Sequence, residues 1–213
     1  MNSSSESVIY DQGKYFWKNN FTMPGHNETV MYEMHIGTFH DAPGGGPGSF
    51  KSAADRLDHI ASLGVNVVQL MPIMEFAGDF SWGYNTAYPF APESAYGTPD
   101  DFKAFIDKAH SLGIGVTLDV VYNHFGPSDT SMWCIDGECL NGGGVYFYDD
   151  WRRETPWGPR PDYGRWEVRD YIFDSAMMWL HQYRADGLRW DATYMVRMAG
   201  WGSDLPEGWG LMQ

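Results

Sequence analysis

The 213-residue chain is poor in cysteine and in basic residues, and no apolar run approaches the roughly 20 residues of a membrane-spanning helix. Its two cysteines are too few for a zinc site or a disulfide framework. Both lie in a loop, at Cys134 and Cys139, where we expect free thiols of a cytoplasmic protein, with a small local disulfide as the alternative. Residues 1–20 contain no apolar core of a signal peptide.

Basic residues are outnumbered by acidic ones, 14 Lys and Arg against 28 Asp and Glu, which gives a formal net charge of −14. A charge of this sign argues against nucleic acids and anionic membranes as partners. Aromatic residues reach 16% and include 10 Trp. Because the apolar faces of sugar rings stack on aromatic side chains, this composition suits a neutral glycan, although most of the aromatics should lie in the core.

Two short apolar runs end in charged residues. Residues 114–118 read IGVTL and reach Asp119, and residues 185–190 read ADGLRW and reach Asp191. Such runs are typical of buried parallel strands that present polar groups at their carboxyl ends. Since side chains alternate along a strand, Arg189 and Asp191 should point to the same side. The pattern predicts an active site where the two strands end.

Strand and helix signals alternate along the chain, which predicts an α/β fold with a parallel sheet and helical crossovers. Ser49 and Thr98 are the expected N-caps of the first two helices. Residues 125–165 should form a long loop rich in Gly, Trp and Tyr. The expected strands are 30–36, 65–71, 114–121 and 185–190, and the expected helices are 50–63, 99–112 and 167–183.

Five segments, in order, resemble the signature regions of the α-amylase superfamily, glycoside hydrolase family 13. The resemblance covers residues 8–213 and is closest to the glycogen branching enzymes and the trehalose-releasing hydrolases. The five segments are YEMHIGTF (32–39), WGYNTAYPFAPESAYGTPDDF (82–102), DVVYNH (119–124), TPWGPRPDYG (155–164) and GLRWD (187–191).

The resemblance implies part of a (β/α)8 TIM barrel, strands one to four with their helices, because a complete barrel has eight strands in about 250 residues. We expect residues 1–29 to be a connector from a missing N-terminal domain and residues 30–213 to be the first half of the catalytic barrel. Residues 125–165 would be the excursion after strand three. The missing C-terminal half would then be a partner, and the isolated chain should be inactive and prone to aggregate.

The resemblance also assigns roles to individual side chains. Asp191 would be the nucleophile of a retaining glycosidase, and Arg189 would stabilise its charged form. Asp119 would support the pocket, and His124 would donate a hydrogen bond to the sugar in subsite −1. Tyr84 would be the aromatic platform beneath that sugar. In the family the acid/base is a Glu after the fifth strand, and no Glu of this chain is assigned that role.

Asn123 matches a residue that helps hold calcium in many α-amylases, and we expect it to take part in substrate binding here. Calcium is not favoured, because residues 125–165 lack a regular spacing of oxygen ligands and branching-type relatives do without the metal. No other metal or cofactor is expected. Trp82, Trp157 and Tyr163 are candidate walls of the sugar subsites, with core packing as an equal alternative.

The resemblance implies an enzyme of glycogen and carbohydrate metabolism that acts on α-1,4-linked glucan or maltooligosaccharide. The favoured activity is 1,4-α-glucan branching by transglycosylation. The first alternative is an α-glucan hydrolase, amylase-like or trehalose-releasing, which differs in using water instead of a sugar to resolve the Asp191 intermediate. The second alternative is a truncated product that is inert or binds glycan weakly.

Overall fold

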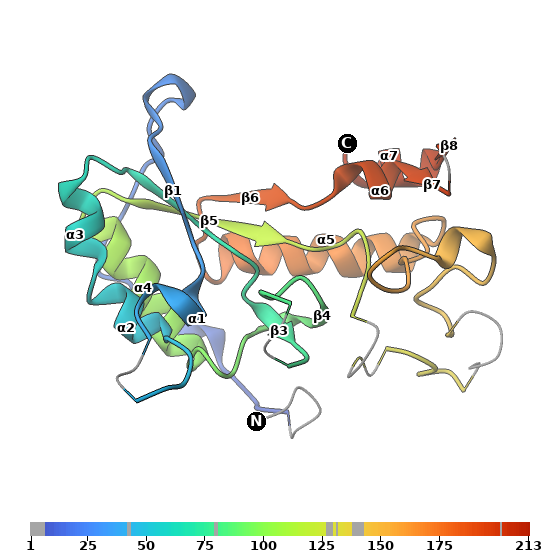
Figure 1. Ribbon diagram of the computed structural model, residues 1–213, viewed down its shortest axis with the longest axis horizontal. Coiled ribbons are helices and arrows are strands. Elements are labelled where there is room, and N and C mark those ends of the chain that lie inside the picture. Colours follow the sequence, from blue (N-terminus) through green and yellow to red (C-terminus); the bar gives the residue numbers. More distant parts are fainter. Residues whose placement is uncertain are drawn as a thin grey trace.

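The centre of the protein is a four-stranded, all-parallel sheet in the order β1-β2-β5-β6 (Figure 1). The computed structural model describes residues 7–41, 44–78, 81–126, 130, 132–137, 143–200 and 202–213. The sheet confirms the predicted α/β class and is consistent with part of a TIM barrel. Its strands are β1 (Met31–Met34), β2 (Val67–Leu70), β5 (Gly115–Val120) and β6 (Gly187–Trp190).

The first two predicted helices begin at the predicted residues. Ser49 and Thr98 are N-caps, and each forms a reciprocal capping box. The predicted helix 50–63 is divided in two, because the amide of Arg56 bonds to the carbonyl of Ala53, three residues back. The α-helices are α1 (Ile36–Phe39), α2 (Phe50–Ala54), α3 (Leu57–Ser62), α4 (Pro99–Ser111), α5 (Trp166–His181), α6 (Thr193–Arg197) and α7 (Pro206–Leu211), and the 3-10 turns are Gln12–Lys14, His26–Glu28 and Trp151–Arg153.

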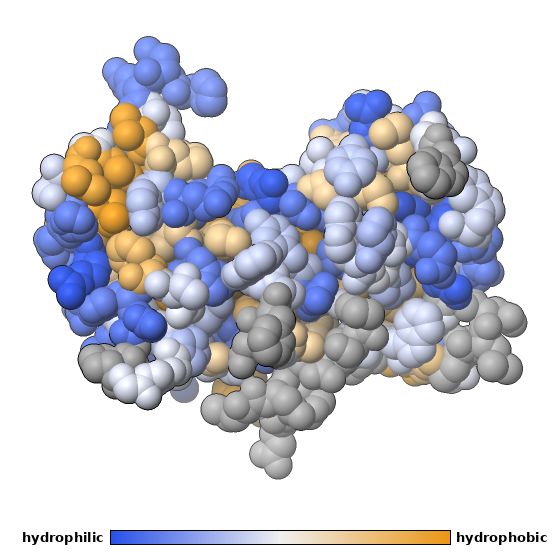
Figure 2. All heavy atoms as spheres, in the orientation of Figure 1, coloured by the Kyte–Doolittle hydropathy of each residue, from blue (hydrophilic) through white to orange (hydrophobic). Residues whose placement is uncertain are grey.

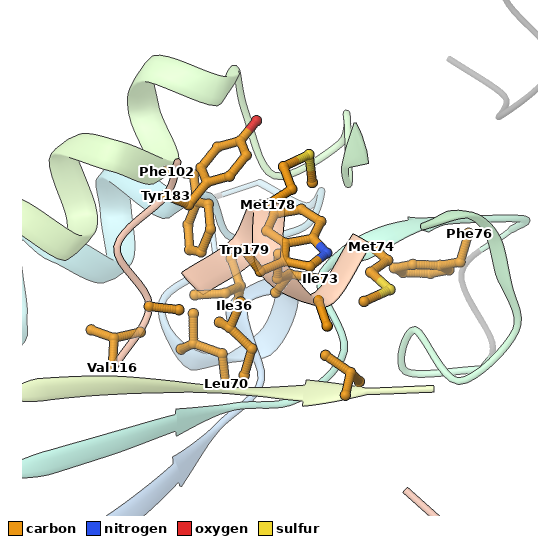
Figure 3. Close-up of a cluster of buried hydrophobic side chains, with 14 of the residues drawn as sticks. Ile36, Leu70, Ile73, Met74, Phe76, Phe102, Val116, Met178, Trp179 and Tyr183 are labelled. Atoms are coloured by element: carbon orange, nitrogen blue, oxygen red, sulfur yellow. The ribbon is translucent and has the colours of Figure 1, made fainter. Parts of the chain in front are cut away.

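One face of the sheet carries the hydrophobic core. Leu70 and Val116 are fully buried and point toward the helices α4 and α5 (Figure 3). Phe102 of α4 and Trp179 of α5 meet above them, with their ring centroids 6.0 Å apart. Since alternate residues of each strand face this core, the residues between them must lie on the other face of the sheet.

The other face of the sheet is polar. Glu33, Gln69 and Thr117 lie in one row across β1, β2 and β5, and Gln69 Nε2 donates to Glu33 Oε2 at 3.0 Å. Figure 2 shows that the surface is hollowed between the end that carries α3 and the end that carries α6 and α7, with hydrophilic residues along the floor. Asp119 and Arg189 lie one row further along the strands, so the predicted site opens on this polar face.

An antiparallel hairpin that the sequence did not indicate follows β2. It consists of β3 (Met74–Phe76) and β4 (Thr86–Pro92). The hairpin is fixed to α5 through the carbonyl oxygen of Pro89, which accepts hydrogen bonds from Ser175 Oγ at 2.8 Å and from Trp179 Nε1 at 3.0 Å. The loop before β4 is thereby held near the end of β5.

The end of the chain consists of several short elements. After α6 the chain forms a short antiparallel ribbon, β7 (Met198–Ala199) and β8 (Ser203–Asp204), before Pro206 begins α7. Gly200 and Gly202, with φ of 55° and 103°, make the reversal between the two strands.

Cys134 is disulfide-bonded, so the expectation of free thiols was wrong. The amide of Gly137 bonds to the carbonyl of Cys134 at 2.9 Å, and Gly137 has a φ of 86°, so the chain reverses here as a short-range disulfide requires. Cys139, the other cysteine, lies outside the described residues.

The N-terminal segment packs on α4. The backbone amides of Lys18 and Asn19 donate to the carboxylate of Asp107, at 3.2 and 2.9 Å. The division into a connector and a half barrel stays a prediction. In the part of the chain that the structure describes, no helix has the length and apolar character needed to cross a bilayer.

Candidate active site

An ion pair joins the ends of β5 and β6. Asp119 and Arg189 are neighbours in the register of the two strands, and Arg189 Nη1 donates to Asp119 Oδ2 at 2.7 Å. The Asp119 side chain is fully buried, whereas 44% of the Arg189 side chain is exposed. The two side chains therefore form a hydrogen-bonded pair on one side of the sheet.

Arg189 also holds the second carboxylate. The same Nη1 donates to Asp191 Oδ1 at 2.7 Å, so one guanidinium nitrogen bridges Asp119 and Asp191. The Asp191 side chain is 18% exposed, which leaves it within reach of a ligand. Charge-assisted hydrogen bonds of this length hold both carboxylates in fixed orientations.

Tyr84 reaches the same cluster from the loop before β4. Its hydroxyl donates to Asp119 Oδ2 at 2.9 Å. A tight turn delivers it there, closed by the bond from the Tyr84 amide to the carbonyl of Ser81 at 3.0 Å. Gly83 has a φ of 89°, and a Cβ on it would collide with the carbonyl oxygen of Pro72. Only glycine fits this position, which explains why Tyr84 follows a glycine.

Asn123 and His124 complete the cluster from beyond the end of β5. Asn123 Nδ2 lies 3.1 Å from both the carbonyl oxygen and Oδ2 of Asp191, and Asn123 Oδ1 lies 2.6 Å from His124 Nδ1. The structure thus brings together every predicted site residue except the candidate walls Trp82, Trp157 and Tyr163 in one hydrogen-bonded group. The link from Asn123 to Asp191 was not predicted from the sequence, although the two residues follow neighbouring strands.

His124 was expected to contact the sugar, but it does not line the open surface. It is 1% exposed, and its ring lies 5.6 Å from that of Trp157. The turn at Trp157 and Gly158 covers it, and Thr155 Oγ1 holds this turn by accepting from both of their amides. A Cβ on Gly158 would collide with the carbonyl oxygen of Phe125. His124 is therefore enclosed by residues more than 30 positions further along the chain.

The three candidate subsite walls have different surroundings. Trp82 is 60% exposed and has a φ of 51°, a left-handed conformation that is strained for a bulky side chain and is found most often at functional sites. Trp157 is partly exposed beside His124. Tyr163 is fully buried and donates to the carbonyl of Tyr122 at 2.8 Å, so it is a core residue and not a wall.

Burial controls the charges in the cluster. It raises the pKa of Asp119 to about 6, against the opposing hydrogen bonds from Arg189 and Tyr84. Burial also raises the pKa of Tyr84, and the Asp119 charge adds to the effect. Burial lowers the pKa of His124 to about 4, although the Asp191 charge and the Tyr84 backbone oppose it, so His124 is neutral at pH 7.

Arg189 keeps its charge in this setting. Burial lowers the pKa of its guanidinium, but the hydrogen bonds and charges of Asp119 and Asp191 outweigh burial and leave the pKa above its ordinary value. The cluster therefore holds a permanent cation between two carboxyl groups.

The substitution Asp119→Asn should remove a pH dependence of stability. Because the pKa of Asp119 rises from 3.8 to about 6, the folded protein binds this proton more tightly than the unfolded chain does. The resulting stabilisation is complete below about pH 4 and is lost as the pH rises through about 6. The difference in Tm, wild type minus variant, should therefore decrease as the pH rises from about 4 through about 6. Differential scanning calorimetry would measure this difference. A constant difference would contradict the raised pKa.

Calcium at Asn123 stays untested. The oxygen of the Asn123 amide faces His124 Nδ1, so the group that holds the metal in many α-amylases has a protein partner here. Among the described residues, no group of three or more His, Cys, Asp or Glu side chains is arranged to hold a metal ion.

A family model and individual known proteins both match this chain, and both point to the α-amylase superfamily that the signature segments resemble. The family model for the catalytic domain of alpha amylase matches residues 34–137. The malto-oligosyltrehalose trehalohydrolase of Deinococcus radiodurans is 42% identical over 170 residues, which is 79% of this chain and 26% of that enzyme. The 1,4-alpha-glucan branching enzyme of Picrophilus torridus is 39% identical over 190 residues, 87% of this chain and 26% of that enzyme.

A solved structure agrees with these relatives. The 1.4 Å crystal structure of an alpha amylase candidate from Salmonella typhimurium superimposes with a TM-score of 0.78 at 40% sequence identity, covering 91% of this chain and 31% of that one. This chain thus spans about a quarter to a third of the length of the proteins that it matches. The signature segments, the sheet and these matches agree, and the chain belongs to the α-amylase superfamily, glycoside hydrolase family 13.

Proposed function

We propose that this chain supplies the nucleophile and part of the sugar pocket of a retaining α-glucan enzyme. The observation that carries the proposal is the position of Arg189 Nη1, 2.7 Å from a carboxylate oxygen of both Asp119 and Asp191. Asp119 is buried behind the guanidinium, whereas Asp191 is partly open. A carboxylate that is oriented by a cation and accessible to substrate is suited to attack a sugar carbon.

In the proposed reaction, a carboxylate oxygen of Asp191 forms a bond to the anomeric carbon while the bond to the leaving glucan oxygen breaks. The leaving oxygen takes a proton from the acid/base carboxyl, which retaining enzymes hold about 5–5.5 Å from the nucleophile. An acceptor hydroxyl or water then attacks the same carbon, returns its proton to the acid/base and releases Asp191. We assign the acid/base to no residue of this chain.

The remaining side chains would bind and orient the sugar. Tyr84 would support the ring of the sugar in subsite −1, since its hydroxyl is fixed by Asp119 and its ring is held in place. Trp82, two residues earlier, would extend this platform with its exposed indole. Asn123 and His124 would complete the pocket behind Asp191.

The substitution Trp82→Ala should weaken glucan binding. Loss of one stacking contact of about 0.5–1.5 kcal/mol should raise KM for maltooligosaccharide by about 2- to 12-fold. Trp166→Ala is the matched control, since Trp166 is 62% exposed at the start of α5, whereas Trp82 is 60% exposed. Steady-state kinetics of the native protein would show the difference, and equal effects of the two substitutions would remove Trp82 from the binding site.

We propose α-1,4-glucan as the substrate and branching as the favoured reaction. Relatives named as branching enzymes match up to 88% of this chain at 36–39% identity. Hydrolysis that releases trehalose is the second candidate, because a trehalohydrolase matches at 42% identity. Incubation of the native protein with amylose, followed by NMR of the product linkages, should show new α-1,6 links. Release of trehalose from malto-oligosyltrehalose, without new links, would favour the second candidate.

A cytoplasmic location stays a prediction. The disulfide at Cys134 weakens it, because such bonds are typical of oxidising compartments.

A further inference from the structure

Asn123 joins two of the side chains assigned above and contacts each with a different end of its amide. Its nitrogen lies 3.1 Å from the carbonyl oxygen and 3.1 Å from Oδ2 of Asp191, and its oxygen lies 2.6 Å from His124 Nδ1. Asn123 is fully buried, so protein groups must satisfy its hydrogen-bonding capacity.

The chemistry of these partners fixes the direction of each bond. Both atoms of Asp191 that face Asn123 are oxygens that accept, so the amide nitrogen must point toward them and the amide oxygen toward His124. His124 must then donate, and its proton must be on Nδ1. Since the pKa of His124 is lowered to about 4 by burial, the ring is neutral at pH 7 and Nε2 has no proton.

The carboxylate of Asp191 is held at both of its oxygens. Arg189 donates to Oδ1 at 2.7 Å, and Asn123 donates to Oδ2 at 3.1 Å. Two donors on different oxygens prevent rotation of the carboxylate about its Cβ–Cγ bond. Loss of either donor would leave one oxygen free to turn away from the reacting carbon.

We propose that Asn123 is a positioning residue that orients the nucleophile Asp191 and, with the other end of its amide, selects the Nδ1–H tautomer of His124. The inference rests on the proposed role of Asp191. It also reverses the expectation that His124 donates to the sugar. Nε2 has no hydrogen-bond partner among the described residues, and without a proton it can only accept a hydrogen bond.

Two substitutions separate the two functions of the amide. Asn123→Asp keeps an oxygen for His124 Nδ1 but replaces the donor that faces Asp191, so the tautomer should persist while kcat falls by about 10–100-fold. Asn123→Ala removes both contacts, so kcat should fall similarly and His124 should move toward the Nε2–H form that neutral imidazole side chains prefer. KM should change less than kcat in both variants.

Asn66 provides a matched control for structural loss. Its amide also joins two segments, since Nδ2 donates to the carbonyl of Glu28 and Oδ1 accepts from the amide of Val30, both at 2.8 Å. Asn66→Ala should lower the Tm but leave kcat and the His124 tautomer unchanged. An equal fall of kcat in this control would mean that Asn123 acts only through stability.

The tautomer is read by NMR of the native protein labelled with ¹⁵N-histidine. The chain has seven histidines, and the His124 signal is identified by its absence in His124→Gln. We expect Nδ1 protonated and Nε2 unprotonated in the wild type and in Asn123→Asp. A wild-type signal with the proton on Nε2, or full kcat in Asn123→Asp, would overturn the inference. Full turnover by Asp191→Asn would instead remove the proposed function and leave the tautomer result intact.

Discussion

Asp191→Asn should reduce turnover of maltooligosaccharide by the native protein by at least about 10⁴-fold, the largest effect expected of any single substitution. The amide keeps the size of the side chain and removes the oxygen that would bond to the anomeric carbon. KM should change little, because the contacts of Tyr84 and Trp82 with the sugar remain. Initial rates with a chromogenic maltooligosaccharide would measure the loss.

The control for this substitution is Asp174→Asn, an equal change of charge on the exposed side of α5. It should leave turnover unchanged. Turnover by Asp191→Asn within about 10-fold of the wild type would contradict the assignment of the nucleophile, since removal of a covalent nucleophile lowers kcat far more than this.

Arg189→Ala should lower both activity and stability. Asp119, fully buried, would lose its cation, and Asp191 would lose the donor to Oδ1. We expect kcat to fall by about 10²-fold through misplacement of the nucleophile. The free energy of unfolding should fall by about 1–3 kcal/mol, less than for a fully buried pair because 44% of the Arg189 side chain is exposed.

A double substitution tests the origin of the stability loss. In the Arg189→Ala background, Asp119→Asn removes the uncompensated buried charge and should restore part of the free energy of unfolding without restoring kcat. Chemical denaturation of the four proteins of the cycle gives the coupling. Additive effects of the two substitutions would contradict a direct interaction of Asp119 with Arg189.

Local signals were sufficient to predict the sheet and the ends of the main helices. The caps Ser49 and Thr98 work through hydrogen bonds within three residues, so a short window of sequence contains the whole cause. The carboxyl ends of β5 and β6 could also be predicted, because an apolar run that stops at a charged residue marks where a buried strand emerges. Adjacent strands then place Asp119 beside Arg189.

Features that depend on distant parts of the chain could not be predicted in this way. The β3–β4 hairpin depends on Ser175 and Trp179 of α5, which bond to Pro89 from more than 80 positions away. The burial of His124 depends on the turn at Trp157. The role of Asn123 follows only when the geometry of two strand ends is combined with the direction of each hydrogen bond.

The most direct test of the central claim is to trap the proposed glycosyl-enzyme intermediate. The native protein would be incubated with a fluorinated α-glucosyl fluoride that forms the intermediate faster than the intermediate is resolved, then digested and analysed by mass spectrometry. We predict that the added sugar mass lies on the peptide that contains Asp191, and that Asp191→Asn carries none. A label on another carboxylate, or rapid turnover with inversion at the anomeric carbon, would contradict the account.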